Sequence, residues 1–230
     1  MSPQSNRSKM YLYLVKIFII IPCLVFLIGT GTTSSANAPD NEQDQLSVQD
    51  DTDEVITING LQYTVPAPWK GNKVDAPTLT YGDFKQIPLK FCKDEGKVYV
   101  TIETQKNLVA MLTQAEEDGL LIQVESGYRS ANYQAKIFKR MFAEGRDFDD
   151  IIRYVAPPGY SNHMLGTAVD FSPSNWRFAD TEQYLWLQEN GNSFGFEEIY
   201  SKANRMKMPW EAWHWQYMGT TEPVDAITTK

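Results

Sequence analysis

Four residues in the second half of this 230-residue chain could together hold a metal ion and activate water. They are the histidines His163 and His214, with Asp170 and Glu211. Imidazole and carboxylate groups both bind Zn²⁺, and a catalytic zinc site uses three protein ligands and leaves the fourth position to water. A carboxylate that is not a ligand must then take a proton from the water and pass it to the leaving amine. We therefore predict one Zn²⁺ on His163, Asp170 and His214, with Glu211 as the general base.

The segment that carries His163 and Asp170 must contain a bend. Side chains alternate between the faces of a strand, so residues seven positions apart on one continuous strand would point to opposite faces. A turn at Gly166 removes this conflict, because His163 can then come from a loop while Asp170 projects from a strand over 168–171. The neighbours of Asp170 in that strand are apolar, which indicates a buried carboxylate that needs a partner or a metal.

A second bend is required before His214. Over residues 213–217, aromatic residues alternate with His214 and Gln216, which is the periodicity of a strand that turns its aromatic face to the core. Glu211 lies three positions before His214 and would point to the wrong face of a continuous strand. We therefore predict a turn or bulge over 209–212 that returns Glu211 to the metal.

The other elements follow from hydrophobic periodicity and turn signals. Strands are predicted over 55–58 and 61–65, joined at Asn59-Gly60, and over 98–102 and 120–125. Helices are predicted over 103–118, 130–144, 147–155 and 181–190, and residues 66–96 form a loop-rich segment. Strands and helices alternate irregularly, without the rhythm of a doubly wound sheet, which indicates an α+β fold.

Individual residues support these helices. The first helix has an apolar face at the spacing i, i+3, i+4, i+7, formed by Leu108, Met111, Leu112 and Ala115. The predicted N-caps of the later helices are Ser130, Asp147 and Thr181. The predicted C-terminal stops are Gly119 and Gly191. The residues expected on the inner face of the second helix are Tyr133, Ile137 and Met141.

Charge and cysteine content bear on the class of protein. The formal net charge of −8 argues against a nucleic-acid-binding protein, which needs a basic face. The two cysteines, Cys23 and Cys92, cannot form a cysteine-rich metal cluster, and we expect no internal disulfide. Cys92 is expected to be a small buried residue.

The N-terminal part has the composition of an export segment followed by a linker. Residues 1–38 combine a basic start, an apolar run and an Ala-x-Ala ending, the layout of a secretory signal peptide. The alternative is an uncleaved membrane anchor over 11–28. Residues 39–54 are acidic and typical of a disordered tether. We therefore predict an exported, extracytoplasmic protein with a folded domain over 55–220 and a tail over 221–230.

Three motifs resemble those of a known enzyme family. The segment 161–170 reads Ser-x-His-x-x-Gly-x-Ala-x-Asp, 211–214 reads Glu-x-Trp-His, and 126–130 reads Ser-Gly-Tyr-Arg-Ser, with Gln134 one turn on. In this order they resemble the zinc D-alanyl-D-alanine carboxypeptidases of the VanY type, in peptidase family M15. Related L,D-carboxypeptidases and D-Ala-D-Ala dipeptidases share the pattern, and the resemblance covers residues 108–219.

The resemblance implies a fold and roles for further residues. It implies a hedgehog/DD-peptidase-like zinc peptidase fold, with a small mixed or antiparallel sheet and flanking helices, and the same zinc ligands and base as predicted above. Arg129 would lie near the scissile carbonyl or the terminal carboxylate of the peptide, because a guanidinium can hold a carboxylate bidentately. Ser161 and Gln134 would add hydrogen bonds to the substrate. Gln216 departs from many relatives, which carry a basic residue there.

The expected function is that of an exported zinc carboxypeptidase that removes the terminal D-alanine from peptidoglycan stem peptides. Two alternatives remain among enzymes, cleavage of the L,D bond of a tetrapeptide and cleavage of an endopeptide bond. From another class, the chain could be a zinc-bound cell-wall-binding module, although such a module has no use for Glu211 as a base. A structural calcium or wall-binding protein is a third hypothesis, based only on the acidic residues over 39–54. Nothing in the sequence indicates an oligomeric state.

Overall fold

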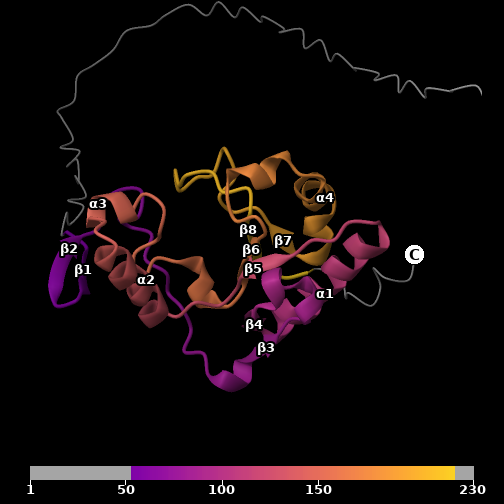
Figure 1. Ribbon diagram of the computed structural model, residues 1–230, viewed down its shortest axis with the longest axis horizontal. Coiled ribbons are helices and arrows are strands. Elements are labelled where there is room, and N and C mark those ends of the chain that lie inside the picture. Colours follow the sequence, from indigo (N-terminus) through magenta and orange to yellow (C-terminus); the bar gives the residue numbers. More distant parts are fainter. Residues whose placement is uncertain (1–52, 221–230) are drawn as a thin grey trace, which may run out of the picture. The chain divides into compact units, whose positions relative to one another are not determined.

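The predicted elements assemble into an α+β fold in the computed structural model, which describes residues 53–220 (Figure 1). The helices are α1 (Ile102–Glu117), α2 (Ala131–Ala143), α3 (Phe148–Ile151) and α4 (Glu182–Asn190). The strands are β1 (Val55–Ile58), β2 (Leu61–Thr64), β3 (Phe84–Gln86), β4 (Tyr99–Thr101), β5 (Val124–Ser126), β6 (Ala168–Phe171), β7 (Phe196–Glu197) and β8 (His214–Tyr217). The predicted signal segment or anchor, the tether up to residue 52 and the C-terminal tail lie outside the described residues.

The central sheet has the strand order β5-β6-β8-β7, and each neighbouring pair is antiparallel. All four residues of β6 are buried, so both faces of this strand are covered. A strand covered on both faces carries apolar side chains on both, and β6 follows this pattern at three of its four positions. Asp170 is the exception in this apolar run, and it pairs with His214 of β8 and with Ser126 of β5. The sheet therefore holds the acidic candidate ligand at its centre, between β8, which carries His214, and β5, which leads into the loop of Arg129.

One hydrophobic core lies between this sheet and the helices α1 and α4. The predicted apolar face of α1 is confirmed, since its four residues are buried in this core. They pack with Val169 and Phe171 of β6 and with Trp215 and Tyr217 of β8. The aromatic face predicted for the last strand is therefore part of the core. Within residues 53–220, no helix is both long enough and apolar enough to cross a membrane.

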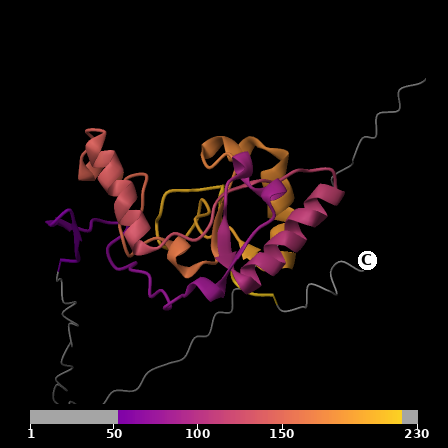
Figure 2. The same ribbon diagram turned by 60° about the horizontal axis from the view of Figure 1, so that its bottom comes forward.

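A second core joins α2 and α3 to the hairpin of β1 and β2. Phe138 of α2 is fully buried, and Tyr63 of β2 stacks on Phe148 of α3 with ring centroids 4.5 Å apart. Figure 1 shows this group on one side of the central sheet and α1 on the other, and the turned view of Figure 2 shows the same separation. The space between the two cores is where the candidate site lies.

The inner face predicted for α2 is right for Met141, which packs against the second core, but its centre lies one residue further along. Tyr133 is exposed and Ile137 and Met141 are half-buried, whereas Gln134 and Phe138 are buried. The predicted N-cap is confirmed, because the Ser130 hydroxyl accepts a hydrogen bond from the Tyr133 amide. Adjacent faces of a helix differ by only about 100°, so the tertiary partner decides which one is covered.

One strand prediction needs correction. The strand expected over 120–125 is shorter, because β5 begins only at Val124. Residues 120–123 connect the turn at Gly119 to this strand, and Leu121 is 51% exposed. The predicted stop at Gly191 is confirmed, because α4 ends at Asn190 with Gly191 as its C-cap, and a 3₁₀ turn η6 (Gly191–Phe194) follows. A Cβ at Gly191 would lie 2.7 Å from Cζ3 of Trp215, so packing against the core aromatic requires this glycine.

The remaining capping and burial predictions hold. The side chains of Asp147 and Thr181 accept hydrogen bonds from the amides of Asp150 and Tyr184, as N-caps do. Cys92 is buried, and burial raises the pKa of its thiol, which agrees with an inert packing role.

The boundary expected after residue 54 also changes. The Glu54 carboxylate accepts hydrogen bonds from the Tyr160 hydroxyl at 2.6 Å and the Gly71 amide at 2.9 Å. Tyr160 immediately precedes the loop that carries Ser161 and His163. Glu54 is therefore part of the folded structure and helps to position that loop.

Gly166 provides a test of the first predicted bend. It has a φ of +72°, and an added Cβ would lie 2.9 Å from Cγ2 of Thr101. Gly145 is a matched control, because its φ is +85° and its Cβ would meet no atom of the described residues within 4 Å. Both Gly→Ala substitutions impose a left-handed strain of about 1–2 kcal/mol, and G166A adds an overpacking cost of about 1–3 kcal/mol. Urea unfolding should show a larger loss of stability for G166A, and equal losses would contradict this account of the turn.

Candidate metal centre and its cavity

Three predicted ligands meet at one buried point. His163 lies on the 3₁₀ turn η4 (Asn162–Leu165), Asp170 on β6 and His214 on β8, and they are 1%, 7% and 3% exposed. One ligand atom from each lies within 4.8 Å of the other two. The antiparallel register of β6 and β8 places Asp170 directly opposite His214. The arrangement is therefore a group of side chains that could hold a metal ion.

The turn at Gly166 brings His163 to this group. Gly166 ends η4 in a left-handed conformation, and its amide donates to the His163 carbonyl at 3.2 Å. The chain then enters β6, so the loop and the strand deliver His163 and Asp170 to the same place. The bend predicted from strand parity is confirmed.

The protonation of His163 indicates that a cation belongs here. Its Nδ1 lies 2.7 Å from the carbonyl oxygen of Gly127, which can only accept, so Nδ1 carries the proton. In the neutral ring Nε2 then presents a lone pair, 3.0 Å from Oδ2 of Asp170. Within the described residues, Nε2 has no hydrogen-bond donor. Two buried electron-pair donors that face each other are stabilised by a cation between them, and a metal ion fits that position.

His214 is oriented from two sides. Its Nδ1 lies 2.9 Å from Oδ1 of Asp170, and the Tyr200 ring stacks on the imidazole with centroids 4.7 Å apart. In either neutral tautomer, one ring nitrogen keeps a lone pair inside the buried site. The chemistry of two imidazoles and one carboxylate fits Zn²⁺, and the 3.0 Å between Nε2 of His163 and Oδ2 of Asp170 is close to the edge of about 3.3 Å expected for a tetrahedron with bonds of about 2.0 Å.

Electrostatics keep the ligands in the forms that bind metal. Burial lowers the pKa of His163 to about 4, so its imidazole is neutral at pH 7. Burial acts to raise the pKa of Asp170, but the interactions with His163 and His214 outweigh it and hold that pKa well below its usual range. Asp170 is therefore a carboxylate and His163 an uncharged donor at neutral pH.

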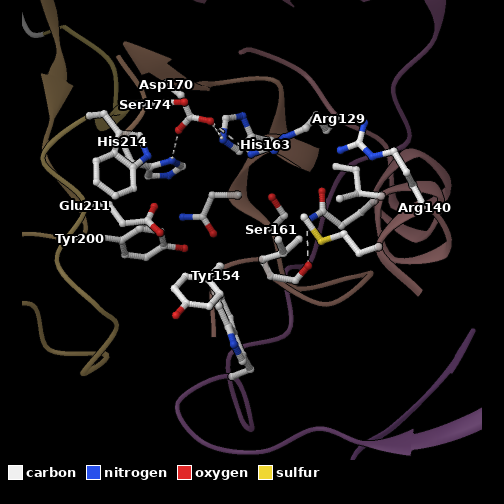
Figure 3. A pocket seen from close by; sticks show the side chains of 18 residues that line it. Arg129, Arg140, Tyr154, Ser161, His163, Asp170, Ser174, Tyr200, Glu211 and His214 are labelled. Atoms are coloured by element: carbon white, nitrogen blue, oxygen red, sulfur yellow. Dashed lines mark hydrogen bonds and ion pairs between the residues drawn. The ribbon is translucent and has the colours of Figure 1, made fainter. Parts of the chain in front are cut away.

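The second predicted bend returns Glu211 to the site. The His214 amide donates to the Glu211 carbonyl at 2.9 Å, which closes a turn immediately before β8. The bend is confirmed, although it is centred on Ala212 and Trp213 and not within 209–212. Burial raises the pKa of Glu211 to about 7. Figure 3 shows its carboxylate facing into the cavity, on the same side as Tyr200.

Arg129 reaches the same site from the loop after β5. Its Nη2 donates to Oδ2 of Asp170 at 3.4 Å, and its backbone amide donates to the His163 carbonyl at 3.2 Å. Its Nε is buried and has no hydrogen-bond partner among the described residues. The guanidinium is thus positioned beside the metal ligands with unused donor capacity.

The two residues expected to bind substrate also line the cavity. Ser161 is buried at its wall. Gln134 is buried as well, and its Nε2 donates to the Ala156 carbonyl at 2.8 Å, while its Oε1 has no donor within residues 53–220. Gln216, the departure from the family pattern, accepts a hydrogen bond from Nδ2 of Asn162 at 2.9 Å. Gln216 therefore ties β8 to η4 next to His163.

A cavity of about 290 Å³ contains all of these groups except Gln216. Trp213, which the strand pattern placed on the core face, packs against that core and also lines this cavity. Sequence reasoning gave no role to other lining residues, namely Trp69, Arg140, Tyr154 and Tyr200. These residues belong to segments far apart in the sequence and share no motif, so only the folded chain brings them together. Tyr200 in particular could not be found, because a single tyrosine in a loop carries no sign that it stacks on a ligand.

Comparisons with known proteins agree with the predicted family. The family model VanY, D-alanyl-D-alanine carboxypeptidase, matches residues 97–220, more than half of the chain. A D-alanyl-D-alanine carboxypeptidase of Enterococcus faecalis is 28% identical over 203 residues, which are 83% of this chain and 69% of that protein. Both results confirm the resemblance seen in the three motifs.

Two solved structures are also similar to this chain. The LD-carboxypeptidase LdcB, whose structure reveals the basis of peptidoglycan recognition, is 26% identical with a TM-score of 0.57, and the match covers 76% of this chain and 88% of that one. This similarity confirms the expected peptidase fold. A vancomycin-resistance D,D-pentapeptidase VanY solved in complex with Zn(II) is 29% identical with a TM-score of 0.45, over 64% of this chain and 89% of that one.

Metal binding should stabilise the fold through Asp170. An ion that binds only the folded state at a thousand times its Kd contributes about 4 kcal/mol. Chelation should therefore lower the Tm, and added Zn²⁺ should restore it. The substitution D170N should abolish the Zn²⁺-dependent shift, whereas D149N, at an exposed acidic residue of α3, should keep it. A full shift in D170N would exclude this residue as a ligand.

Proposed function

This chain belongs to the VanY family of D-alanyl-D-alanine carboxypeptidases, and we propose that it is a zinc-dependent enzyme that removes the terminal D-alanine from peptidoglycan stem peptides. The observation that supports this proposal is the composition of one cavity. It holds a buried group of three metal-binding side chains, a separate carboxylate of raised pKa and an arginine. These are the parts that metal-assisted hydrolysis of an amide requires.

We propose His163, Asp170 and His214 as the zinc ligands. When bound there, Zn²⁺ supplies Lewis acidity that polarises a peptide carbonyl and activates water. The protein prepares this site in advance, because Gly127 fixes the tautomer of His163 and Tyr200 fixes the ring plane of His214. Such preorganisation reduces the rearrangement needed during reaction.

Glu211 is the proposed general base and acid. Its side chain lies in the cavity outside the ligand group, and burial brings the pKa of its carboxyl to about 7. A carboxyl group with a pKa near the working pH can accept a proton from water and return it to the departing amine. The proton thus moves from the attacking water to Glu211 and then to the nitrogen of the released D-alanine.

Arg129 is the proposed partner for the negative charge of the substrate. A planar guanidinium can hold a carboxylate bidentately, or steady the charge that develops on the scissile carbonyl oxygen. Ser161 and the Oε1 of Gln134 are proposed to hydrogen-bond the peptide. The free Oε1 of Gln134 is an acceptor and therefore suits a peptide N–H.

Cleavage of an L,D bond is the second candidate activity. The structural similarity to the LD-carboxypeptidase LdcB is the observation in its favour. A binding module without catalysis is a weaker candidate, because Glu211 suits hydrolysis and has no purpose in simple binding; cleavage of an endopeptide bond stays an alternative without an observation in its favour. For any of the wall-directed activities we propose an extracytoplasmic location, with residues 1–38 as the export signal or residues 11–28 as an anchor.

The proposed specificity can be tested with defined stem peptides. The zinc-loaded protein is incubated with a pentapeptide ending in D-Ala-D-Ala and with the tetrapeptide that lacks the last residue, and the products are identified by mass spectrometry. Release of D-alanine from the pentapeptide alone is the expected result. Release from the tetrapeptide alone would replace the D,D-assignment by the L,D-assignment, and activity on neither would overturn the carboxypeptidase proposal.

The role of Glu211 predicts a separation between metal binding and catalysis. The substitution E211Q should lower kcat by about 10²–10⁴-fold, because the proton acceptor is lost, while the zinc content stays at one ion per chain. E197Q is the matched control, since Glu197 is exposed and lies outside the cavity. Elemental analysis and peptide hydrolysis measure the two properties separately. A fully active E211Q enzyme would refute the assigned mechanism.

A further inference from the structure

A second cavity adjoins the one that holds the metal centre. Its volume is about 300 Å³, and Arg129, Ile137 and Arg140 line both cavities. The other lining residues of the second cavity are Lys97, Val98, Tyr99, Glu125, Ser126, Gly127, Tyr128 and Tyr133. The two cavities therefore meet along the loop after β5 and the adjacent face of α2. A ligand in the first can extend into the second past the shared arginines.

The second cavity has an excess of positive charge. It is lined by Lys97, Arg129 and Arg140, and by one acidic residue, Glu125. The Glu125 carboxylate already pairs with Nζ of Lys93 at 3.0 Å and accepts the Ser174 amide at 3.1 Å. Its charge is therefore largely compensated, as is that of Arg129 by Asp170, and Lys97 and Arg140 supply the positive charge suited to an anionic group.

Arg140 is the side chain best placed to bind such a group. Its ion pair with Glu144 is 3.8 Å long and both side chains are more than half exposed, at 68% and 57%. An exposed pair of this kind contributes little and does not hold the guanidinium in place. Figure 3 shows Arg129 between His163 and Arg140, so Arg140 lies farther from the ligands. Arg129 is committed to the metal side through Asp170.

The second cavity also shares a backbone segment with the metal centre. Gly127 lines the second cavity, and its carbonyl oxygen accepts a hydrogen bond from Nδ1 of His163. The Tyr128 amide donates to the Tyr99 carbonyl at 2.7 Å, which fixes this segment against β4. None of the proposed metal ligands, nor Glu211, lines the second cavity, so a group bound there would select a substrate without taking part in the chemistry.

We propose that the second cavity is a subsite for a carboxylate of the peptide substrate other than its C-terminal one, and that Arg140 is the specificity-determining residue. This proposal rests on the proposed function, because it places a peptide in the first cavity. The ligand class is a peptide that carries a free carboxylate on a residue preceding the bond that is cleaved. Lys97 adds positive charge at the same subsite.

Two peptides that differ in one group provide the test. Both are pentapeptides ending in D-Ala-D-Ala with a γ-linked D-glutamate, and its α-carboxylate is free in one and amidated in the other. The wild-type zinc enzyme should have a kcat/KM about tenfold higher for the free carboxylate, the size expected for a charge-assisted hydrogen bond. R140Q should lower kcat/KM on the carboxylate peptide and remove this preference, and K97Q should reduce it. K139Q, on the same helix but outside both cavities, should keep it.

Calorimetric titration of the same peptides into zinc-loaded E211Q separates this proposal from the proposed function. A preference for the carboxylate peptide that disappears in E211Q/R140Q supports the subsite, even if the wild-type protein hydrolyses neither peptide. If the two peptides bind equally, or if R140Q loses the same factor in kcat/KM on both, the proposed subsite is wrong. Neither result contradicts the proposed hydrolytic activity. R140K should recover part of the preference, because it restores the charge without the planar guanidinium.

Discussion

The carboxylate of Asp170, buried at the centre of the sheet, is the constraint on which the site depends. A charge removed from water is costly unless other groups compensate it. In this protein Nδ1 of His214 lies 2.9 Å and Nη2 of Arg129 lies 3.4 Å from the carboxylate, and Nε2 of His163 faces it at 3.0 Å across the position proposed for the metal. These residues belong to η4, to β8 and to the loop after β5. A single buried charge therefore determines how three separate parts of the chain must meet.

The position between two hydrophobic cores gives this group its rigidity. The core of α1, α4 and the sheet supports Asp170 and His214 from one side. The core of α2, α3 and the hairpin contributes Tyr200, which stacks on His214. The hydrogen bond of Glu54 to Tyr160 adds a third support, next to the loop of His163. The proposed catalytic group is therefore held from several directions, as metal-assisted chemistry would require.

Charge is distributed unevenly around the cavity. Glu211 and Tyr200 lie on one side, and Arg129 and Arg140 lie on the other, as Figure 3 shows. The buried carboxyl of Glu211 has a raised pKa and suits proton transfer, while the arginines suit the anionic groups of a peptide. The proposed enzyme thus separates proton handling from substrate recognition within one cavity. The overall net charge of −8 conceals this local excess of positive charge.

The sequence by itself predicted a zinc site and the need for two bends. Ligand types and strand parity required a turn at Gly166 and another before His214, because side-chain alternation leaves no other way to bring the residues together. The tertiary structure decided what parity and periodicity leave open. The covered face of α2 is the one with Gln134 and Phe138, since the β1–β2 hairpin packs there. The tertiary structure also brought Tyr200 and Arg140 to the site. Such contacts depend on how the two cores pack, and they leave no periodic pattern in the chain that the sequence could reveal.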